Sequence, residues 1–154
     1  MKKVMYICSV GGHLTQMLQM KEIFNKHKYV LITEKTDVTK EMKNEYNTEY
    51  LIYGSRKYLL RYLIIFTLNI FKSMYLFIKY RPDVIISTGT HTAVPMCYIG
   101  WLFRKKVIYI ESFAKNKTPT LTGKLVYPIA TKFIVQWESM LKVFPKAEYW
   151  GGIY

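Results

Sequence analysis

The first apolar run of the chain, together with the turn that follows it, constrains the fold most strongly. Lys3-Val4-Met5-Tyr6-Ile7-Cys8 contains five consecutive apolar residues, and Ser9-Val10-Gly11-Gly12-His13 follows before a helical pattern begins. A short apolar run that passes through a glycine pair into a helical pattern is typical of a buried parallel strand followed by a helix. The pattern therefore predicts an α/β fold organised around this unit.

The Gly11-Gly12 pair makes this turn a candidate anion site. Glycines allow a sharp turn that leaves backbone N–H groups uncovered, and the start of a helix adds partial positive charge. Phosphate and pyrophosphate groups bind at such places. His13, in the first turn of the expected helix, is placed to hydrogen-bond a ligand or to accept a proton. The alternative is a plain strand-to-helix turn with His13 in solvent, because two glycines are a weaker signal than a full dinucleotide-binding motif.

The remaining chain alternates between apolar runs and helical patterns. Further strands are expected at Tyr29–Thr33, Glu49–Tyr53, Arg81–Ser87, Lys106–Ile110, Lys132–Trp137 and Ala147–Trp150. Helices are expected at Gly12–Lys26, Arg56–Arg81 and Leu125–Thr131, with a polar loop at Ala114–Gly123 and a loop with a short helix at Glu34–Asn47. This alternation predicts a parallel sheet, and 154 residues correspond to one domain.

Charge and composition narrow the classes of partner. The formal net charge is +13, which favours an anionic partner such as nucleic acid, lipid head groups or a phosphorylated substrate. A hydrophobic fraction of 51% excludes a disordered chain. Cys8 and Cys97 both lie in apolar surroundings, so we expect buried, reduced thiols in a cytosolic protein. The N-terminal apolar run is only about six residues long and leads into the glycine pair, so we expect no signal peptide.

The stretch from Arg56 to Arg81 is apolar enough to interact with a bilayer. Ten residues without charge, Tyr62–Phe71, form its centre, and the whole stretch is long enough to span a membrane. On a helix, its basic residues fall within about 60° of one another. They are Lys57, Arg61, Lys72 and Lys79.

Such a stripe predicts a helical segment at about 57–80 that lies in the interface of an anionic membrane. A true span is disfavoured because the strands before and after this helix are expected in one sheet. A core helix with snorkelling lysines is the alternative.

A second glycine-containing turn follows the strand that ends at Ser87. Thr88-Gly89-Thr90-His91-Thr92 leads into another helical pattern at Pro95. The carboxyl ends of parallel strands meet at one edge of a sheet, so this turn is expected to face the first glycine loop. Threonine hydroxyls can donate to phosphate oxygens, and His91 adds a titratable group; helix capping by threonine is the alternative.

Glu111 follows the strand Lys106–Ile110 directly. A carboxylate at this tip could orient a histidine, bind a sugar hydroxyl or act as a base, or it could simply cap a helix. The three histidines and two cysteines show no spacing typical of a metal site.

Taken in order, these motifs carry a resemblance to a known family. The motifs are Ser9-Val10-Gly11-Gly12-His13, Ser87–Pro95, Glu111-Ser112-Phe113-Ala114, Thr122-Gly123-Lys124-Leu125, Gln136-Trp137 and Pro145-Lys146-Ala147. The ordered set resembles the PssD/CpsF family of bacterial polysaccharide-synthesis proteins, relatives of the membrane subunit of the split N-acetylglucosaminyltransferase of N-glycan assembly. It is more loosely similar to the N-terminal half of MurG, although Cys8, Ser9 and Val10 replace further glycines of that loop.

The resemblance implies a fold and an activity. The fold would be the Rossmann-like, N-terminal half of a GT-B glycosyltransferase, which binds the acceptor. The reaction would transfer a sugar from a UDP-sugar to a polyprenyl-diphosphate-linked saccharide at the cytoplasmic face of the membrane, in capsule or exopolysaccharide synthesis. His13 would be the base, with Glu111 as its competitor or orienting partner, and no metal or other cofactor is expected. The pyrophosphate would be held by Gly11, Gly12, Gly89, Thr90, His91 and Thr92.

The resemblance also implies a separate subunit that carries the UDP-sugar site. After the expected strand Ala147–Trp150 only four residues remain, whereas a one-chain GT-B enzyme needs a second domain there. Aromatic residues are favoured interface anchors, so the C-terminal end is the expected contact. Its residues are Tyr149, Trp150, Ile153 and Tyr154. Two rival functions are a non-catalytic membrane scaffold that recruits a transferase and a nucleic-acid binder, the latter disfavoured because no recognition motif accompanies the charge.

Overall fold

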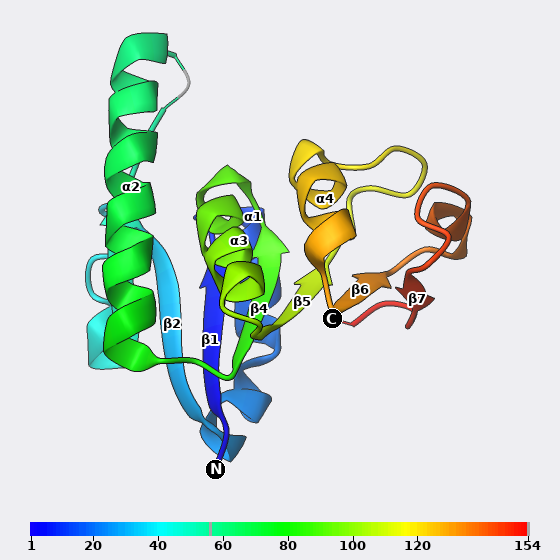
Figure 1. Ribbon diagram of the computed structural model, residues 1–154, viewed down its shortest axis with the longest axis horizontal. Helices are drawn as coiled ribbons and strands as arrows, with labels where there is room; N and C mark the ends of the chain where they lie inside the picture. The colour runs from blue at the N-terminus through cyan, green and yellow to red at the C-terminus, as the bar shows by residue number, and fades with distance from the viewer. Residues whose placement is uncertain (56, 154) are drawn as a thin grey trace.

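The computed structural model describes residues 1–55 and 57–153. Its centre is a parallel sheet of seven strands in the order β3-β2-β1-β4-β5-β6-β7 (Figure 1). The strands are β1 (Lys3–Cys8), β2 (Lys28–Lys35), β3 (Thr48–Ile52), β4 (Val84–Gly89), β5 (Lys106–Ile110), β6 (Lys132–Val135) and β7 (Glu148–Tyr149). The parallel sheet expected from the apolar runs is thus confirmed. β1 and β5 have the expected bounds, and the ends of the other strands differ by a few residues.

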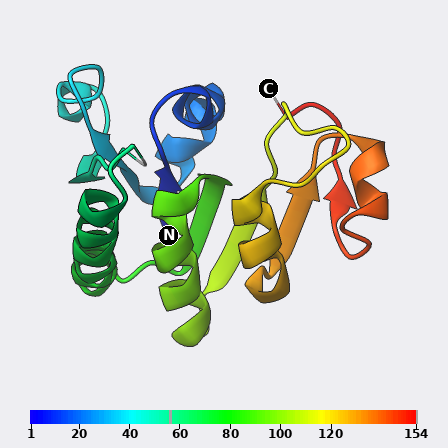
Figure 2. The same ribbon diagram turned by 90° about the horizontal axis from the view of Figure 1, so that it is seen from above.

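Helices cover the two faces of the sheet unequally. The helices α2 (Leu59–Tyr80), α3 (Val94–Leu102) and α4 (Leu121–Val126) lie on one face, and α1 (Gly12–Gln19) lies on the other (Figure 2). Side chains of β1 alternate between the two cores, as a pleated strand requires. Met5 and Ile7 pack with α2 and α3, whereas Tyr6 packs with α1.

The strand order reverses between β1 and β4. β1 pairs with β2 on one side and with β4 on the other, and α2 is the crossover that brings the chain back from the β3 edge. Ligands of open α/β sheets bind at such a reversal, outside the carboxyl ends of the strands. The two glycine turns leave β1 and β4, so the topology places both at this point.

The largest differences from the expected helices are in α1 and α4. The helix expected to run to Lys26 ends at Gln19, and a 3₁₀ helix, η1 (Lys21–Lys26), follows. This tighter segment packs Phe24 against the Tyr6 ring, with centroids 4.3 Å apart.

The helix expected from Leu125 instead begins at Leu121, inside the expected polar loop. The Thr120 hydroxyl accepts a hydrogen bond from the Gly123 N–H at 2.8 Å and caps this earlier start. The 3₁₀ helix η4 (Tyr127–Ile129) takes the place of the expected last turns.

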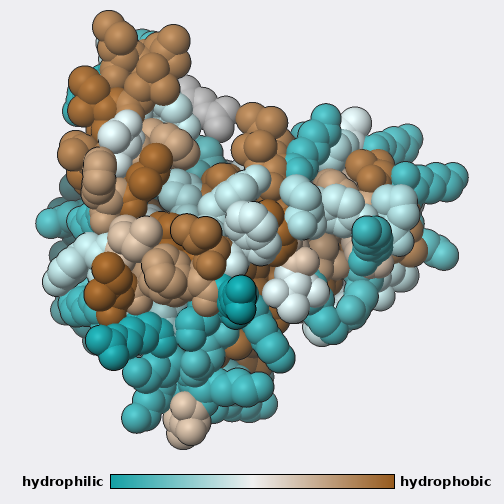
Figure 3. Space-filling model, in the orientation of Figure 1, coloured by the Kyte–Doolittle hydropathy of each residue, from teal (hydrophilic) through white to brown (hydrophobic). Residues whose placement is uncertain are grey.

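The helix α2 is oriented with its polar residues toward the sheet. Asn69 and Ser73 are buried together with Leu76 and Phe77, while large apolar side chains are exposed along the outer side (Figure 3). They include Leu60, Ile64, Leu68, Phe71, Tyr75 and Ile78. By length and composition this 22-residue helix could cross a membrane.

The basic stripe expected on α2 is only partly present. Lys57 precedes the helix, and the Lys79 ammonium donates to a carboxylate oxygen of Glu49 on β3 at 2.7 Å. Arg61 and Lys72 lie about 20° apart on the helix surface. The stripe therefore begins at Arg61, and Lys79 ties the end of α2 to the sheet edge.

Candidate functional site

Direct hydrogen bonds join the two glycine loops. The Ser9 N–H donates to the Gly89 carbonyl at 3.0 Å, and the Thr90 hydroxyl donates to the Ser9 hydroxyl at 3.0 Å. The two loops therefore lie next to each other, as expected. They are in direct contact and do not face each other across a cleft. Together they form one polar surface at the carboxyl ends of β1 and β4.

His13 is fixed at this junction by two contacts with Thr88. The ring Nδ1 lies 2.6 Å from the Thr88 carbonyl oxygen, and the Thr88 hydroxyl donates to the His13 carbonyl at 2.9 Å. A carbonyl oxygen can only accept, so Nδ1 carries the hydrogen. In the neutral ring the Nε2 nitrogen is then unprotonated and can accept a proton.

Backbone conformation and the nearby His13 ring both favour glycine at position 89 of the second loop. Gly89 has a φ of +100°, and a Cβ atom built on it would lie 3.1 Å from the His13 ring. Any larger residue would therefore be strained and would displace the imidazole. Gly11 has a φ of +80° and precedes the first turn of α1, where backbone N–H groups have no partner within the helix.

The threonines and histidine of the second loop do not share one environment. Thr90 is partly exposed, and its hydroxyl also lies 3.3 Å from the His91 Nδ1 atom. The His91 ring contacts the Tyr62 ring of α2, with centroids 5.3 Å apart. Thr92, in contrast, is 2% exposed, so its hydroxyl does not reach the loop surface as the sequence had suggested.

Glu111 is buried and holds its own loop together. One carboxylate oxygen accepts from the Ser112 N–H at 2.9 Å, and the other accepts from the Thr120 N–H at 3.2 Å. The Thr120 hydroxyl also donates to this carboxylate, at 2.9 Å to the nearer oxygen. This geometry fits the capping alternative better than the role of a base.

Glu34 lies beside the site, although the sequence predicts a loop with no assigned function from this residue onward. It belongs to the end of β2, is 2% exposed, and accepts a hydrogen bond from the Val10 N–H at 3.3 Å. Burial raises the pKa of its carboxyl. An acidic residue directly after an apolar strand run is the sequence pattern that could have indicated Glu34 as a residue near the site.

The two cysteines are free and buried, as their apolar surroundings predicted. Burial raises the pKa of Cys8 to about 12, which makes its thiol unreactive although it adjoins the first loop. Among residues 1–55 and 57–153, no group of three or more His, Cys, Asp or Glu side chains could hold a metal ion.

The C-terminal segment lies over the sparsely covered face of the sheet. Trp150 is 55% exposed and Ile153 partly exposed, and both line a 360 Å³ cavity together with Ile108 and Ile134. The Ile153 N–H donates to the Gln136 side chain at 3.1 Å. Tyr154, expected to share an interface with these residues, lies outside the described residues.

The sheet order and the paired loops define a class of domain. It is Rossmann-like and corresponds to one half of a GT-B glycosyltransferase. MurG from Acinetobacter baumannii superposes on it with a TM-score of 0.72 and 16% identity, over 90% of this chain and 43% of MurG. At that identity the likeness concerns the fold alone.

The sequence places the chain more narrowly. It belongs to the family described as oligosaccharide biosynthesis protein Alg14 like, whose model matches residues 4–153. The Yarrowia lipolytica protein named UDP-N-acetylglucosamine transferase subunit ALG14 is 28% identical over 97% of this chain and 80% of its own length. The Candida albicans protein of the same name is 42% identical over 48% of this chain, and the match spans 36% of that relative.

Proposed function

We propose that this chain is the acceptor-binding, membrane-associated subunit of a two-component glycosyltransferase. The reaction transfers a sugar from a UDP-sugar to a polyprenyl-diphosphate-linked saccharide. The observation that carries the proposal is His13, locked by Thr88 between two glycine loops at the reversal of the sheet. Relatives named as UDP-N-acetylglucosamine transferase subunits support the reaction class. A role in bacterial capsule or exopolysaccharide synthesis, as in the PssD/CpsF proteins, is part of this proposal.

The two loops divide the work of binding and proton transfer. The N–H groups at Gly12 and the partial charge of α1 stabilise the acceptor diphosphate. His91 donates from the second loop, and Thr90 holds the two loops together through its hydrogen bond to Ser9. The acceptor hydroxyl gives its proton to His13 Nε2 while its oxygen bonds to the anomeric carbon of the donor. The bond between that carbon and UDP breaks, and UDP leaves with the electron pair. Glu111 positions the loop 112–119 and touches no reacting atom.

Replacement of His13 tests the proposal. With the partner subunit present, His13→Ala is expected to lower the transfer rate about 100- to 10,000-fold, which is the usual contribution of a general base. His27→Ala is the matched control, because His27 lies next to the start of β2, at the opposite end of the sheet. Full activity of His13→Ala would contradict this catalytic role and favour the scaffold alternative.

Membrane association is the second part of the proposal. The outer side of α2 from Tyr58 to Tyr80 lies in the interface of an anionic bilayer at its cytoplasmic face, with Arg61 and Lys72 toward the head groups. A span is disfavoured because β3 and β4, which flank α2, belong to one sheet.

Salt-sensitive binding to anionic vesicles is therefore expected. Each of the two cations contributes about 1 kcal/mol near such a surface. Arg61→Gln with Lys72→Gln should weaken co-sedimentation with these vesicles and leave binding to neutral vesicles unchanged. Protease protection that placed the two chain ends on opposite sides of a vesicle would contradict the interface position.

The third part concerns the separate subunit that carries the UDP-sugar. Tyr149, Trp150 and Ile153 offer an aromatic and apolar surface for it, and exposed aromatic residues are common interface anchors. Relatives named as transferase subunits support a separate chain for that site. Truncation after Glu148 should abolish co-purification of that subunit while the thermal unfolding midpoint of the remainder stays measurable. Sugar transfer by this chain alone would overturn the split arrangement.

A further inference from the structure

An apolar groove runs between α2 and α3 on the face of the molecule shown in Figure 3. Its volume is 370 Å³, within the range of roughly 300–1,000 Å³ usual for small-molecule sites. Its walls include Phe66 and Ile70 from α2 and Val94, Tyr98, Trp101 and Leu102 from α3. Ile70, Tyr98, Trp101 and Leu102 are between 37% and 66% exposed, so the groove is open along much of its length.

One end of this groove begins at the second glycine loop. Val94 is the first residue of α3 and follows the short 3₁₀ helix η3 (His91–Ala93) directly. The contact between the Tyr62 and His91 rings brings α2 to the same place. An anionic group bound on the loops would therefore lie at the mouth of the apolar groove.

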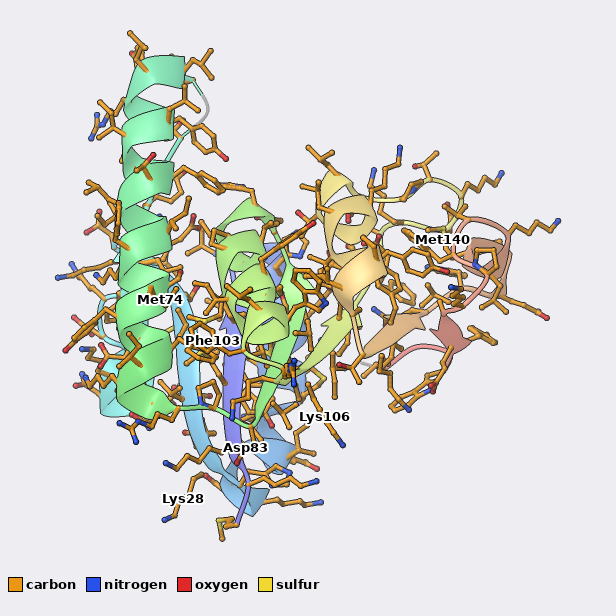
Figure 4. The ribbon with its side chains drawn as sticks, viewed as in Figure 1. Lys28, Met74, Asp83, Phe103, Lys106 and Met140 are labelled. Carbon is orange, nitrogen blue, oxygen red and sulfur yellow. The ribbon has the colours of Figure 1, made fainter. Side chains whose placement is uncertain are left out.

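The far end of the groove leads to exposed apolar surface. Trp101 and Leu102 are 52% and 66% exposed, and Phe103 packs between the helices against Phe77, with centroids 5.0 Å apart (Figure 4). On the α2 side, the groove wall at Ile70 continues around the helix toward the exposed apolar side chains at Ile64 and Phe71. The groove thus connects the polar loops to the surface proposed to lie in the membrane.

We propose that this groove binds the isoprenyl units next to the diphosphate of the lipid acceptor. The inference rests on the proposed function and adds a site for the lipid chain to the site for its head. Unsaturated hydrocarbon makes no hydrogen bonds, which suits a groove lined by aliphatic and aromatic side chains. The diphosphate stays on the loops, the first units lie along α3, and the remaining chain passes over α2 into the bilayer. Recognition therefore includes the lipid, and a short-chain acceptor binds less tightly.

Binding of geranylgeranyl diphosphate and inorganic pyrophosphate to the full chain tests this site. We expect geranylgeranyl diphosphate to bind on the order of 100-fold more tightly than pyrophosphate, because the chain buries apolar area in the groove. Ile70→Trp fills the groove and should bring the two affinities together while pyrophosphate binding is retained. Ile64→Trp makes the same change on the exposed side of the same helix and should keep the difference.

Each outcome decides between the two proposals. Equal affinities in the unsubstituted chain, or a preference that survives Ile70→Trp, would overturn the groove site. Geranylgeraniol that binds in an Ile70-dependent way, without any pyrophosphate binding, would support the groove and contradict the diphosphate site. If Ile70→Trp fails to fold by circular dichroism, Leu102→Asp replaces it, since Leu102 is exposed at the far end; an unchanged preference in that variant would also overturn the site.

Discussion

The helices α2 and α3 cover the same face of the sheet, and both are rich in apolar residues, yet they use them in opposite ways. α3 buries Met96 and Cys97 completely against the sheet. α2 buries Asn69 and Ser73 and leaves most of its large apolar side chains exposed. Composition alone does not separate the two helices. An outward apolar face of this size is typical of a surface that meets lipid or another apolar partner.

Polar contacts account for the inverted packing of α2. The Asn69 amide accepts from the Ile52 N–H and donates to the Ile52 carbonyl, both at 2.8 Å, and so completes the end of the edge strand β3. Further along, Lys79 and the Tyr80 hydroxyl both donate to Glu49 at 2.7 Å. These bonds hold α2 in place while its opposite side remains free for an interface.

The largest effect is expected on the outer side of α2 in the presence of a membrane. Leu68→Ser with Phe71→Ser should reduce partition into anionic vesicles by about 3–6 kcal/mol, because each side chain contributes about 1.5–3 kcal/mol when it is buried in an apolar medium. Unfolding in the absence of membrane should be nearly unchanged. Vesicle flotation measures the partition, and unaltered flotation would place the contact surface elsewhere.

The opposite result is expected in α3. Met96→Ala should lower the free energy of unfolding by about 2–5 kcal/mol, since it removes a fully buried side chain and leaves a cavity. Leu68→Ala in α2 should change it by less than about 0.5 kcal/mol in the absence of membrane. Urea denaturation compares the two; a similar loss in both variants would erase the contrast between the helices.

A smaller effect is expected at the polar attachment of α2. Asn69→Leu leaves the Ile52 backbone groups without their side-chain partner and should cost about 1–3 kcal/mol of unfolding free energy. Thr67→Leu, on the exposed side of the same helix, is the control and should have little effect. If leucine at position 69 stabilised the chain, α2 would be held by apolar contacts after all.

The smallest effect concerns the ion pair at the end of α2. Burial alone would raise the pKa of Glu49, but hydrogen bonds from Lys79 and Tyr80 and the charge of Lys43 lower it overall. A lowered carboxyl pKa contributes stability that is present above the unfolded pKa and is lost as the pH falls through the folded value. Glu49→Gln should therefore lose up to about 1 kcal/mol at pH 7 and nothing at pH 2, as measured by thermal unfolding at both pH values.

Much of the fold could be predicted because it depends on local patterns. The apolar runs at Lys3–Cys8 and Lys106–Ile110 match β1 and β5 residue for residue, and their alternation with helices indicates a parallel sheet. The helix ends were harder to predict. The lysines and threonines around Thr120 are typical of a polar loop. The helix begins there because the Thr120 hydroxyl accepts a hydrogen bond from the Gly123 N–H.

The candidate site could be predicted only in part. The motifs place the two glycine turns at the carboxyl ends of β1 and β4, and they therefore predict Gly11, His13 and Gly89 as candidate site residues. The bond from His13 to Thr88 joins residues 75 positions apart, and the burial of Thr92 depends on how η3 turns. Neither follows from a local pattern. The hydrogen bonds of Glu111 could not be predicted for the same reason, since the loop must fold back over nine residues to bring Thr120 to the carboxylate.

The close contact between Gly89 and His13 means that the effect of a substitution at one position depends on the residue at the other. A Cβ atom at position 89 would lie 3.1 Å from the imidazole, and the φ of +100° strains any residue other than glycine there, so Gly89→Ala should lower activity even though it deletes no functional group. A second-site change from His13 to a smaller residue should relieve the close contact only, because the backbone strain at position 89 remains. Variation at position 89 is therefore constrained both by its own backbone and by the loop that it faces.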